Sequence, residues 1–442
     1  MVNPVANLFK VPELKEKILF TLLVLLIYRV GAHITVPSVD FVALQQAFAG
    51  YQGTLLGVYD LFVGGALSRA TVLALGIMPY ISASIMFQLL AAVFPTIEKM
   101  QKEGEDGRKK LTQWTRYATI GLAFLQAYGY AVFLQSMNGG EVTVVRNTGF
   151  VFLVTTALIL TMGAVFVMWL GEQMTERGIG NGMSLLIFFS IIEGFPRALA
   201  TTWEQVSTGV ISWFAVIALA AVMVLVVAGV VAMTMAARKI PVQIPRKVMG
   251  RGRVREGQKS FIPLRINSAG VMPIIFAQSI IIIPGTAAQF SNFAALRRIS
   301  TELQPGAWLY NVLYAVLILF FTYFYTSIIF NPVDLAENLK KQGGFIPGVK
   351  PGARTAEYID YVLSRVTIVG ALYLALIALM PFWIIGAFGL GNTFFFGGTS
   401  LLIVVGVALD TVQQMQQHLL LRHYEGFMKK GRVRFRGRQR YM

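Results

Sequence analysis

The side chains that could carry out chemistry in this sequence are few and widely spaced. Arg29, Glu193 and Asp410 are ionisable residues that lie within long apolar runs or near their ends, and their positions in the sequence predict no coupled pair. The three histidines lack the spacing of metal ligands, and the absence of cysteine excludes disulfides and thiolate sites. No serine–histidine constellation is present either. The sequence therefore predicts neither an enzyme nor a bound cofactor or metal.

The composition is that of a protein embedded in a membrane. Hydrophobic residues make up 56% of the 442 residues and charged residues only 13%, against roughly 25% charged residues in soluble domains. Several apolar runs exceed the roughly 18 residues that indicate a spanning helix. We predict an all-α polytopic membrane protein with ten spans, at Ile18–Val36, Thr71–Phe94, Tyr117–Met137, Phe150–Leu170, Met183–Ala200, Val210–Ala237, Ala269–Phe290, Trp308–Phe330, Val362–Trp383 and Gly397–Gln413.

Charge is distributed unevenly between the two sides of the predicted membrane. The formal net charge is +17, and the loops on the side of the amino terminus, together with Arg365 near the start of the ninth span, hold 32 basic and 14 acidic residues. The opposite loops, together with Glu193 and Arg197 near the end of the fifth span, hold five basic and six acidic residues. Cytoplasmic loops of membrane proteins carry the excess of lysine and arginine. We therefore predict that both termini lie in the cytoplasm.

A short repeat marks the second and the seventh span. Residues 76–81 read Gly-Ile-Met-Pro-Tyr-Ile, and residues 270–275 read Gly-Val-Met-Pro-Ile-Ile. Because proline removes an amide donor and clashes with the preceding turn, each copy predicts an interruption within its span. Paired breaks at matching positions indicate two inverted five-span halves with a pathway between them. A kinked helix that only packs on its neighbours is the alternative.

The side chains at these breaks are isoleucine and methionine rather than charged groups. A narrow apolar constriction excludes ions by dewetting, and flexible apolar side chains could pack around passengers of varied chemistry. A secondary transporter with a midplane site for a small solute is the alternative, because broken helices alone allow it. Such a transporter is expected to carry coupled ionisable groups at the midplane.

Three segments on the predicted cytoplasmic side are strongly basic, namely 238–265, 331–361 and the tail 418–442. The first of them alone holds nine basic residues. Such charge fixes the orientation of the chain or meets anionic lipid. Orientation needs only a few charges in each loop, so these segments also predict docking of an acidic partner, such as RNA or an acidic protein face.

Long stretches of the sequence resemble the SecY family, the channel-forming subunits of bacterial protein-translocation complexes. One of them is GGALSRATVLALGIMPYISASI, and together they comprise residues 64–85, 103–117, 168–188, 266–277, 330–355 and 396–410. The resemblance covers essentially the whole chain. It implies an hourglass channel between two pseudo-symmetric halves, 1–200 and 201–417, in the bacterial cytoplasmic (inner) membrane. It also implies that unfolded polypeptides with signal sequences pass through the pore, and that apolar segments leave into lipid through a lateral gate.

The resemblance further implies roles for individual residues. The pore ring would consist of Ile77, Ile81, Met183, Ile187, Ile275 and Ile403. A short helix near residues 60–73 would act as a plug, with Leu61, Gly64, Gly65, Leu67 and Arg69. Polar contacts across the lateral gate would come from Ser82, Gln88 and Asn267.

Partners follow from the same resemblance. The basic segments would dock the ribosome, including its RNA, or the SecA motor, and SecE and SecG would accompany the chain in the membrane. The docking residues would be Arg246, Lys247, Arg251, Arg253, Arg255, Lys340, Lys341, Lys350, Arg354, Arg434 and Arg436. The driving energy would come from these partners and not from any residue of the chain.

Overall fold

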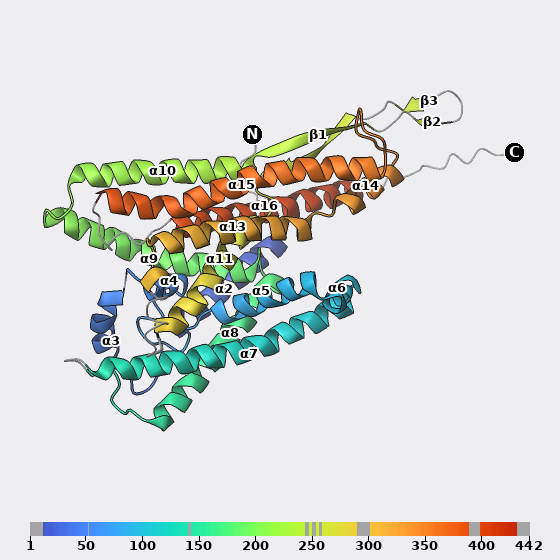
Figure 1. Cartoon of the computed structure of the whole chain (residues 1–442). Coiled ribbons are helices and arrows are strands. Elements are labelled where there is room, and N and C mark those ends of the chain that lie inside the picture. The colour runs from blue at the N-terminus through green and yellow to red at the C-terminus, as the bar shows by residue number, and fades with distance from the viewer. Residues whose placement is uncertain are drawn as a thin grey trace.

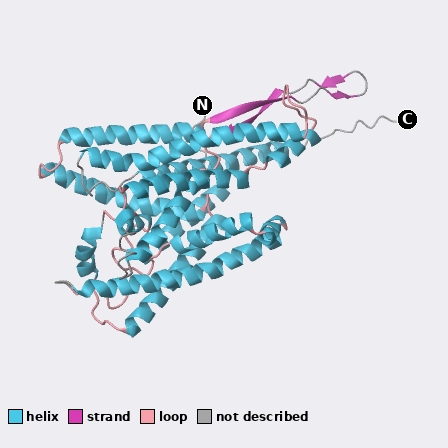
Figure 2. Cartoon of the chain, viewed as in Figure 1, coloured by secondary structure: helices cyan, strands magenta, loops and turns pink. Residues whose placement is uncertain are grey.

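The computed structural model describes residues 12–430, except 52, 140–142, 244–246, 250–252, 256–258, 290–300 and 389–397. Over these residues the chain is mainly helical, with two narrow β-ribbons at one end (Figures 1 and 2). Each predicted span overlaps one helix over most of its length. These ten helices are α2 (Pro12–Gly31), α5 (Met78–Val93), α7 (Glu105–Ser136), α8 (Phe150–Arg177), α9 (Gly182–Ser207), α10 (Trp213–Met235), α11 (Met272–Gln289), α13 (Trp308–Ile329), α15 (Ala353–Phe388) and α16 (Gly398–Lys430).

Shorter helices connect the long ones. They are α3 (Phe41–Phe48), α4 (Leu55–Phe62), α6 (Pro95–Lys102) and α14 (Pro332–Lys341), with 3-10 turns η1 (Ala49–Tyr51) and η2 (Met137–Gly139). Side-chain caps fix several helix starts, because a polar side chain accepts the otherwise unpaired amides of the first turn. Asn181, for example, accepts the N–H groups of Met183 and Ser184 at 3.0 and 3.3 Å, and so sets the start of α9.

Six of the described helices are long and apolar enough to cross a membrane, or seven if α5 and α6, which meet at 110°, are counted as one broken span. The helices α2 and α16 carry more polar residues, and the described part of α11 is shorter. Length and composition of the described helices therefore support six or seven spans, and the number ten stays a prediction.

The helices form two groups that follow the order of the chain. Helices α2 to α9 pack mainly on one another, as do α10 to α16, and the groups lie on opposite sides of the molecule in Figure 1. They meet where α5 contacts α11 and where α9 contacts α16. One continuous cluster of buried apolar side chains runs through both groups. The core therefore lies at the junction of the two halves.

The two copies of the Gly-x-Met-Pro repeat begin helices, so the prediction of a break inside a span was wrong. Gly76 and Gly270 have φ angles of 53° and 63°, in the left-handed region that glycine adopts without strain. Helices α5 and α11 then start at Met78 and Met272. Each proline falls in the first helical turn, where its missing N–H would have had no partner in the helix. The repeat is thus a helix-start signal used twice.

The basic segment 238–265 forms a β-hairpin rather than an irregular loop. Strands β1 (Ala237–Gln243) and β4 (Lys259–Arg265) pair antiparallel, with Ile240 opposite Ile262. Farther out, β2 (Lys247–Met249) pairs with β3 (Arg253–Arg255). Figure 2 shows this ribbon in magenta, extending away from the helices.

Candidate functional site

Five isoleucines of the expected pore ring come together from both halves in the central apolar cluster. Ile77 and Ile81 lie at the start of α5, Ile187 on α9, Ile275 on α11 and Ile403 on α16. Their side chains are between 0 and 6% exposed. The helices that carry them touch one another, since α5 contacts α11, and both α9 and α11 contact α16.

Met183, the sixth residue expected in the ring, is placed differently. It is the second residue of α9 and only partly buried. Its sulfur packs directly on Gly171 of α8, so closely that a Cβ atom at position 171 would clash with it. Met183 therefore packs on a helix of its own half, next to the central cluster rather than within its most buried part.

A compact stretch of α4 and turns, residues 55–77, fills the junction between the halves and is called segment 55–77 below. The short helix expected over 60–73 lies earlier, at Leu55–Phe62, so that expectation was wrong. Gly64 and Gly65, with φ angles of 69° and 73°, end the helix, and the Gly65 N–H donates to the Asp60 carbonyl at 2.8 Å. Two consecutive left-handed residues cannot continue a helix.

Both halves hold segment 55–77 in place. The Leu55 N–H donates to Oε1 of Gln304 at 3.2 Å, and Leu55 packs on Gly285 of α11. From the other half, the Tyr130 hydroxyl of α7 donates to the Leu67 carbonyl at 2.6 Å. The segment is therefore held between the two halves by contacts with each of them.

An acidic residue, Asp60, organises the interior of the segment. Its Oδ1 accepts the Ser68 N–H at 2.8 Å, which closes the turns back onto α4. Burial raises the pKa of the Asp60 carboxyl above its ordinary value, while the Ser68 N–H acts in the opposite direction.

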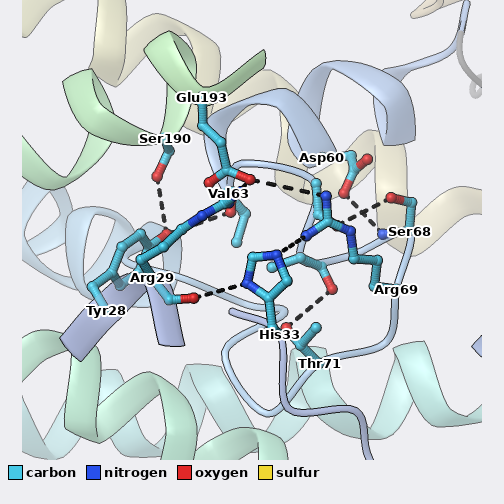
Figure 3. Close-up of polar contacts among 12 residues, drawn as sticks. Tyr28, Arg29, His33, Asp60, Val63, Ser68, Arg69, Thr71, Ser190 and Glu193 are labelled. Carbon is cyan, nitrogen blue, oxygen red and sulfur yellow. Dashed lines mark hydrogen bonds and ion pairs between the residues drawn. The ribbon is translucent and has the colours of Figure 1, made fainter. Parts of the chain in front are cut away.

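A polar network joins the segment to α2 and α9 (Figure 3). Glu193 of α9 forms an ion pair with Arg29 of α2 and lies 3.9 Å from the guanidinium of Arg69. His33 contacts the same Arg69 side chain at 3.1 Å. The expectation of no coupled pair among the ionisable residues was therefore wrong. The pairing has no local sequence signal, because the three charged residues are up to 164 positions apart and lie in three different elements.

A small cavity lies between segment 55–77, α5, α7 and α11. Ser82, Gln126, Ser279 and Thr286 add polar atoms to a lining that is otherwise apolar or tyrosine. The Met78 sulfur and the Ser279 hydroxyl lie 3.9 Å apart across the α5–α11 contact. Of the three residues expected to make polar contacts across the gate, only Ser82 lines this cavity.

The other two expected gate residues make different contacts. Gln88 donates to Ser84 of its own helix at 3.1 Å. Asn267 lies in the turn before α11 and lines a second small cavity, together with Thr234 and Asp410. All the residues around this second cavity belong to the C-terminal half, because the turn faces α10 and α16 rather than α5.

The hairpin and the segment 331–361 form one unit, called the basic platform below. Gln243 and Phe345 exchange two backbone hydrogen bonds of 2.9 Å. A separate buried cluster joins the two parts through Ile240, Val242, Leu264, Ile346 and Ile359. The two predicted basic segments, separate in the sequence, therefore form a single surface.

The docking residues expected on 331–361 are all exposed on this platform, namely Lys340, Lys341, Lys350 and Arg354. Lys341 and Arg354 each lie within 4 Å of a glutamate one helical turn away. Lys247, Arg253 and Arg255 lie on β2 and β3, of which only the backbone is described. Arg246, Arg251, Arg434 and Arg436 lie outside the described residues.

Comparison with known proteins identifies the family. The family model described as SecY matches residues 71–412. The chain belongs to the SecY family. Protein translocase subunit SecY of Escherichia coli (strain K12) is 45% identical over 430 residues, with 96% of each chain covered.

Two solved channel structures share the fold. One is of a SecY protein whose plug domain is described as stabilising the closed state and maintaining a membrane seal; it has a TM-score of 0.65, 17% identity and 95% coverage of both chains. The other is Sec61 in the canine ribosome-channel complex from the endoplasmic reticulum, with a TM-score of 0.61, 17% identity and 95% coverage of both chains. Membership of this family identifies a channel subunit rather than an enzyme, and gives no support to a transporter of small solutes.

Replacing Gly76 by alanine is expected to loosen the junction. A Cβ atom at Gly76 would lie 2.9 Å from Cγ1 of Val63 in segment 55–77, at a φ angle of 53°. The left-handed conformation alone costs about 1–2 kcal/mol for a residue with a Cβ. We expect a lower denaturation temperature and a higher resting ion conductance of the purified channel. Gly121→Ala on α7, where a Cβ meets nothing within 4 Å, is the matched control; an equal change in both variants would contradict the prediction.

Proposed function

We propose that the chain conducts unfolded polypeptides across the cytoplasmic membrane of a bacterium, through a passage between its two halves. The five isoleucines and segment 55–77 close this passage at rest. The observation that supports the proposal is the gathering of these buried apolar side chains from α5, α9, α11 and α16, with a separate segment lying against them. The entering polypeptide would displace segment 55–77 and would then be surrounded by the apolar isoleucine side chains, which contact any sequence without specific hydrogen bonds.

The seam between α5 and α7 on one side and α11 and α13 on the other is proposed as the lateral gate. The contact across it between α5 and α11 is mostly apolar, with a cavity beside it. A passing segment would partition there according to its own transfer free energy. Leucine-like residues favour the membrane by about 0.3–0.6 kcal/mol each, while a central arginine disfavours it by about 2.5–3.5 kcal/mol. Several leucines are therefore needed to outweigh one charge.

The basic platform is proposed as the docking surface for the ribosome and for the SecA motor. Its exposed lysines and arginine support contacts to RNA phosphates or to an acidic protein face. The likeness to a channel bound to a ribosome is consistent with this use. SecE and SecG are proposed to cover part of the apolar surface. One such surface is α10, because only 11% of its apolar part is buried within the chain.

We propose that the platform end of the molecule faces the cytoplasm, together with both termini. The hairpin, α6, α14 and the carboxyl end of α16 all lie at the same end of the helices (Figure 1). The basic segments therefore gather on one side, as expected of cytoplasmic loops. The proposed halves are 1–200 and 201–417, and 418–442 forms the tail.

The proposed passage can be tested by closing the seam with a thiol crosslinker. The chain contains no cysteine, so Met78→Cys with Ser279→Cys provides the only thiol pair in it. Proteoliposomes with this variant, its membrane subunits and SecA are supplied with a precursor protein and ATP, and protease-protected precursor is measured. We expect a short, cleavable crosslinker to stop translocation and its cleavage to restore it.

The control places the crosslink within one half. Arg116 of α7 and Glu172 of α8 form a bidentate ion pair at 2.8 and 2.9 Å, so Arg116→Cys with Glu172→Cys accepts the same crosslinker. Translocation should continue in this linked variant. Failure of the channel to import precursor before any crosslinking, or normal import through the crosslinked α5–α11 seam, would contradict the proposed function.

A further inference from the structure

Glu193 lies where three separate elements of the chain meet. Its side chain is 12% exposed, and it faces Arg29 of α2 and Arg69 of segment 55–77, whose side chains are 36% and 13% exposed. Figure 3 shows both guanidinium groups directed toward the one carboxylate. The negative charge of Glu193 is thus shared by two positive charges. One is Arg69 of segment 55–77, and the other is Arg29 of the long helix α2.

A histidine fixes the position of the Arg69 guanidinium. Nδ1 of His33 lies 2.9 Å from the Arg29 carbonyl, which can only accept, so Nδ1 carries the proton. Nε2 is then free to accept a hydrogen bond from Nη1 of Arg69, at 3.1 Å. The guanidinium is therefore held from one side by a neutral imidazole and attracted from the other by the carboxylate.

The backbone of the segment approaches α9 closely at the same place. A Cβ atom on Gly64 would lie 3.0 Å from Oε2 of Glu193 and 3.3 Å from the Cα atom of Ser190. The Tyr28 hydroxyl of α2 lies 2.9 Å from Oγ of Ser190 and donates to the Val63 carbonyl at 3.4 Å. The segment, α2 and α9 are thus joined by hydrogen bonds beside the charged groups.

We propose that Glu193 is a latch that holds segment 55–77 in the closed channel, and that it sets how readily the segment leaves. This inference rests on the proposed function, since it assumes that the segment closes the passage. Moving the segment outward separates Arg69 from Glu193. The attraction between the Arg69 guanidinium and the Glu193 carboxylate therefore opposes this movement. Neutralising Glu193 leaves Arg29 and Arg69 near each other without the carboxylate that they share, which favours departure of the segment.

The latch can be tested through the exposure of one thiol. Ser68→Cys introduces a nearly isosteric thiol next to Arg69, at a residue that is 8% exposed in the closed segment. The complex is purified with cysteine-free membrane subunits in nanodiscs, so that a charged maleimide reaches both faces. We expect Glu193→Gln to raise the labelling rate by at least about tenfold, the factor that corresponds to about 1.4 kcal/mol.

Two controls separate the latch from general loosening of the fold. Glu204→Gln removes the same charge from an exposed position on the same helix, and should leave the labelling rate unchanged. Thr322→Cys, 1% exposed on α13, should stay protected in the Glu193→Gln background. An unchanged rate at Ser68→Cys, or an equal rise at Thr322→Cys, would overturn the proposal.

A double-mutant cycle tests the pairing itself. Arg69→Gln should also raise the labelling rate, and combining it with Glu193→Gln should give less than the product of the two single factors. Full multiplication of the two effects would mean that the residues act independently, and would overturn the latch. The labelling assay needs no passenger, so a failure of translocation with normal labelling would count against the proposed function alone.

Discussion

Serine at positions 81 and 275 makes the resting channel leak ions, if the isoleucines close the passage as proposed. Ile81 and Ile275 are 6% and 2% exposed and lie on α5 and α11, which meet at the junction of the halves. Replacing a buried isoleucine by a small residue lowers the stability of the packed state by about 2 kcal/mol or more. If the double variant Ile81→Ser/Ile275→Ser destabilises the closed state by about 2 kcal/mol and leaves the open state unchanged, the ratio of open to closed channels rises by about 30-fold.

The measurement is the resting conductance of purified complexes in planar bilayers. The matched control replaces isoleucines at exposed helix positions, Ile328→Ser on α13 and Ile368→Ser on α15, which are 41% and 45% exposed. These replacements should leave the resting conductance at the level of the unmodified channel. An unchanged conductance of the Ile81→Ser/Ile275→Ser variant would rule out these two residues as part of the seal.

Reversing the charge of the basic platform is expected to abolish most of its binding to ribosomes. The variant carries glutamate in place of Lys340, Lys341, Lys350 and Arg354, all of which are exposed. Each lost contact to an RNA phosphate removes about one unit from the slope of the logarithm of affinity against the logarithm of salt concentration. We therefore expect weaker binding and a flatter salt dependence. Binding to SecA should weaken as well if an acidic face of the motor docks here.

Affinities are measured by co-sedimentation of nanodisc-embedded channel with ribosomes over a series of salt concentrations. Exchanging lysine and arginine with one another at the same four positions keeps every charge and provides the control, although a bidentate contact would be lost where lysine replaces arginine. Equal affinity and an equal salt slope for the charge-reversed variant would show that partners dock elsewhere.

The amino-acid sequence by itself determined where the helices run and which segments are basic. A helix that crosses lipid needs about 20 apolar residues in a row, so each predicted span is visible locally and each overlaps a helix. The excess of basic residues on one side is likewise visible in the loops. The repeat at 76–81 and 270–275 is also visible in the sequence, but proline in a first turn begins a helix instead of breaking one.

Only the tertiary structure decided which distant residues meet. It paired Glu193 with Arg29 and Arg69, and it packed Asn267 against α10 and α16 of its own half, away from the cavity that Ser82 lines. It also joined the hairpin to segment 331–361 through Gln243 and Phe345. The physical reason is the distance along the chain over which each interaction acts. Hydropathy, capping and turn chemistry act within a few residues, whereas these contacts depend on how whole helices pack across the two halves.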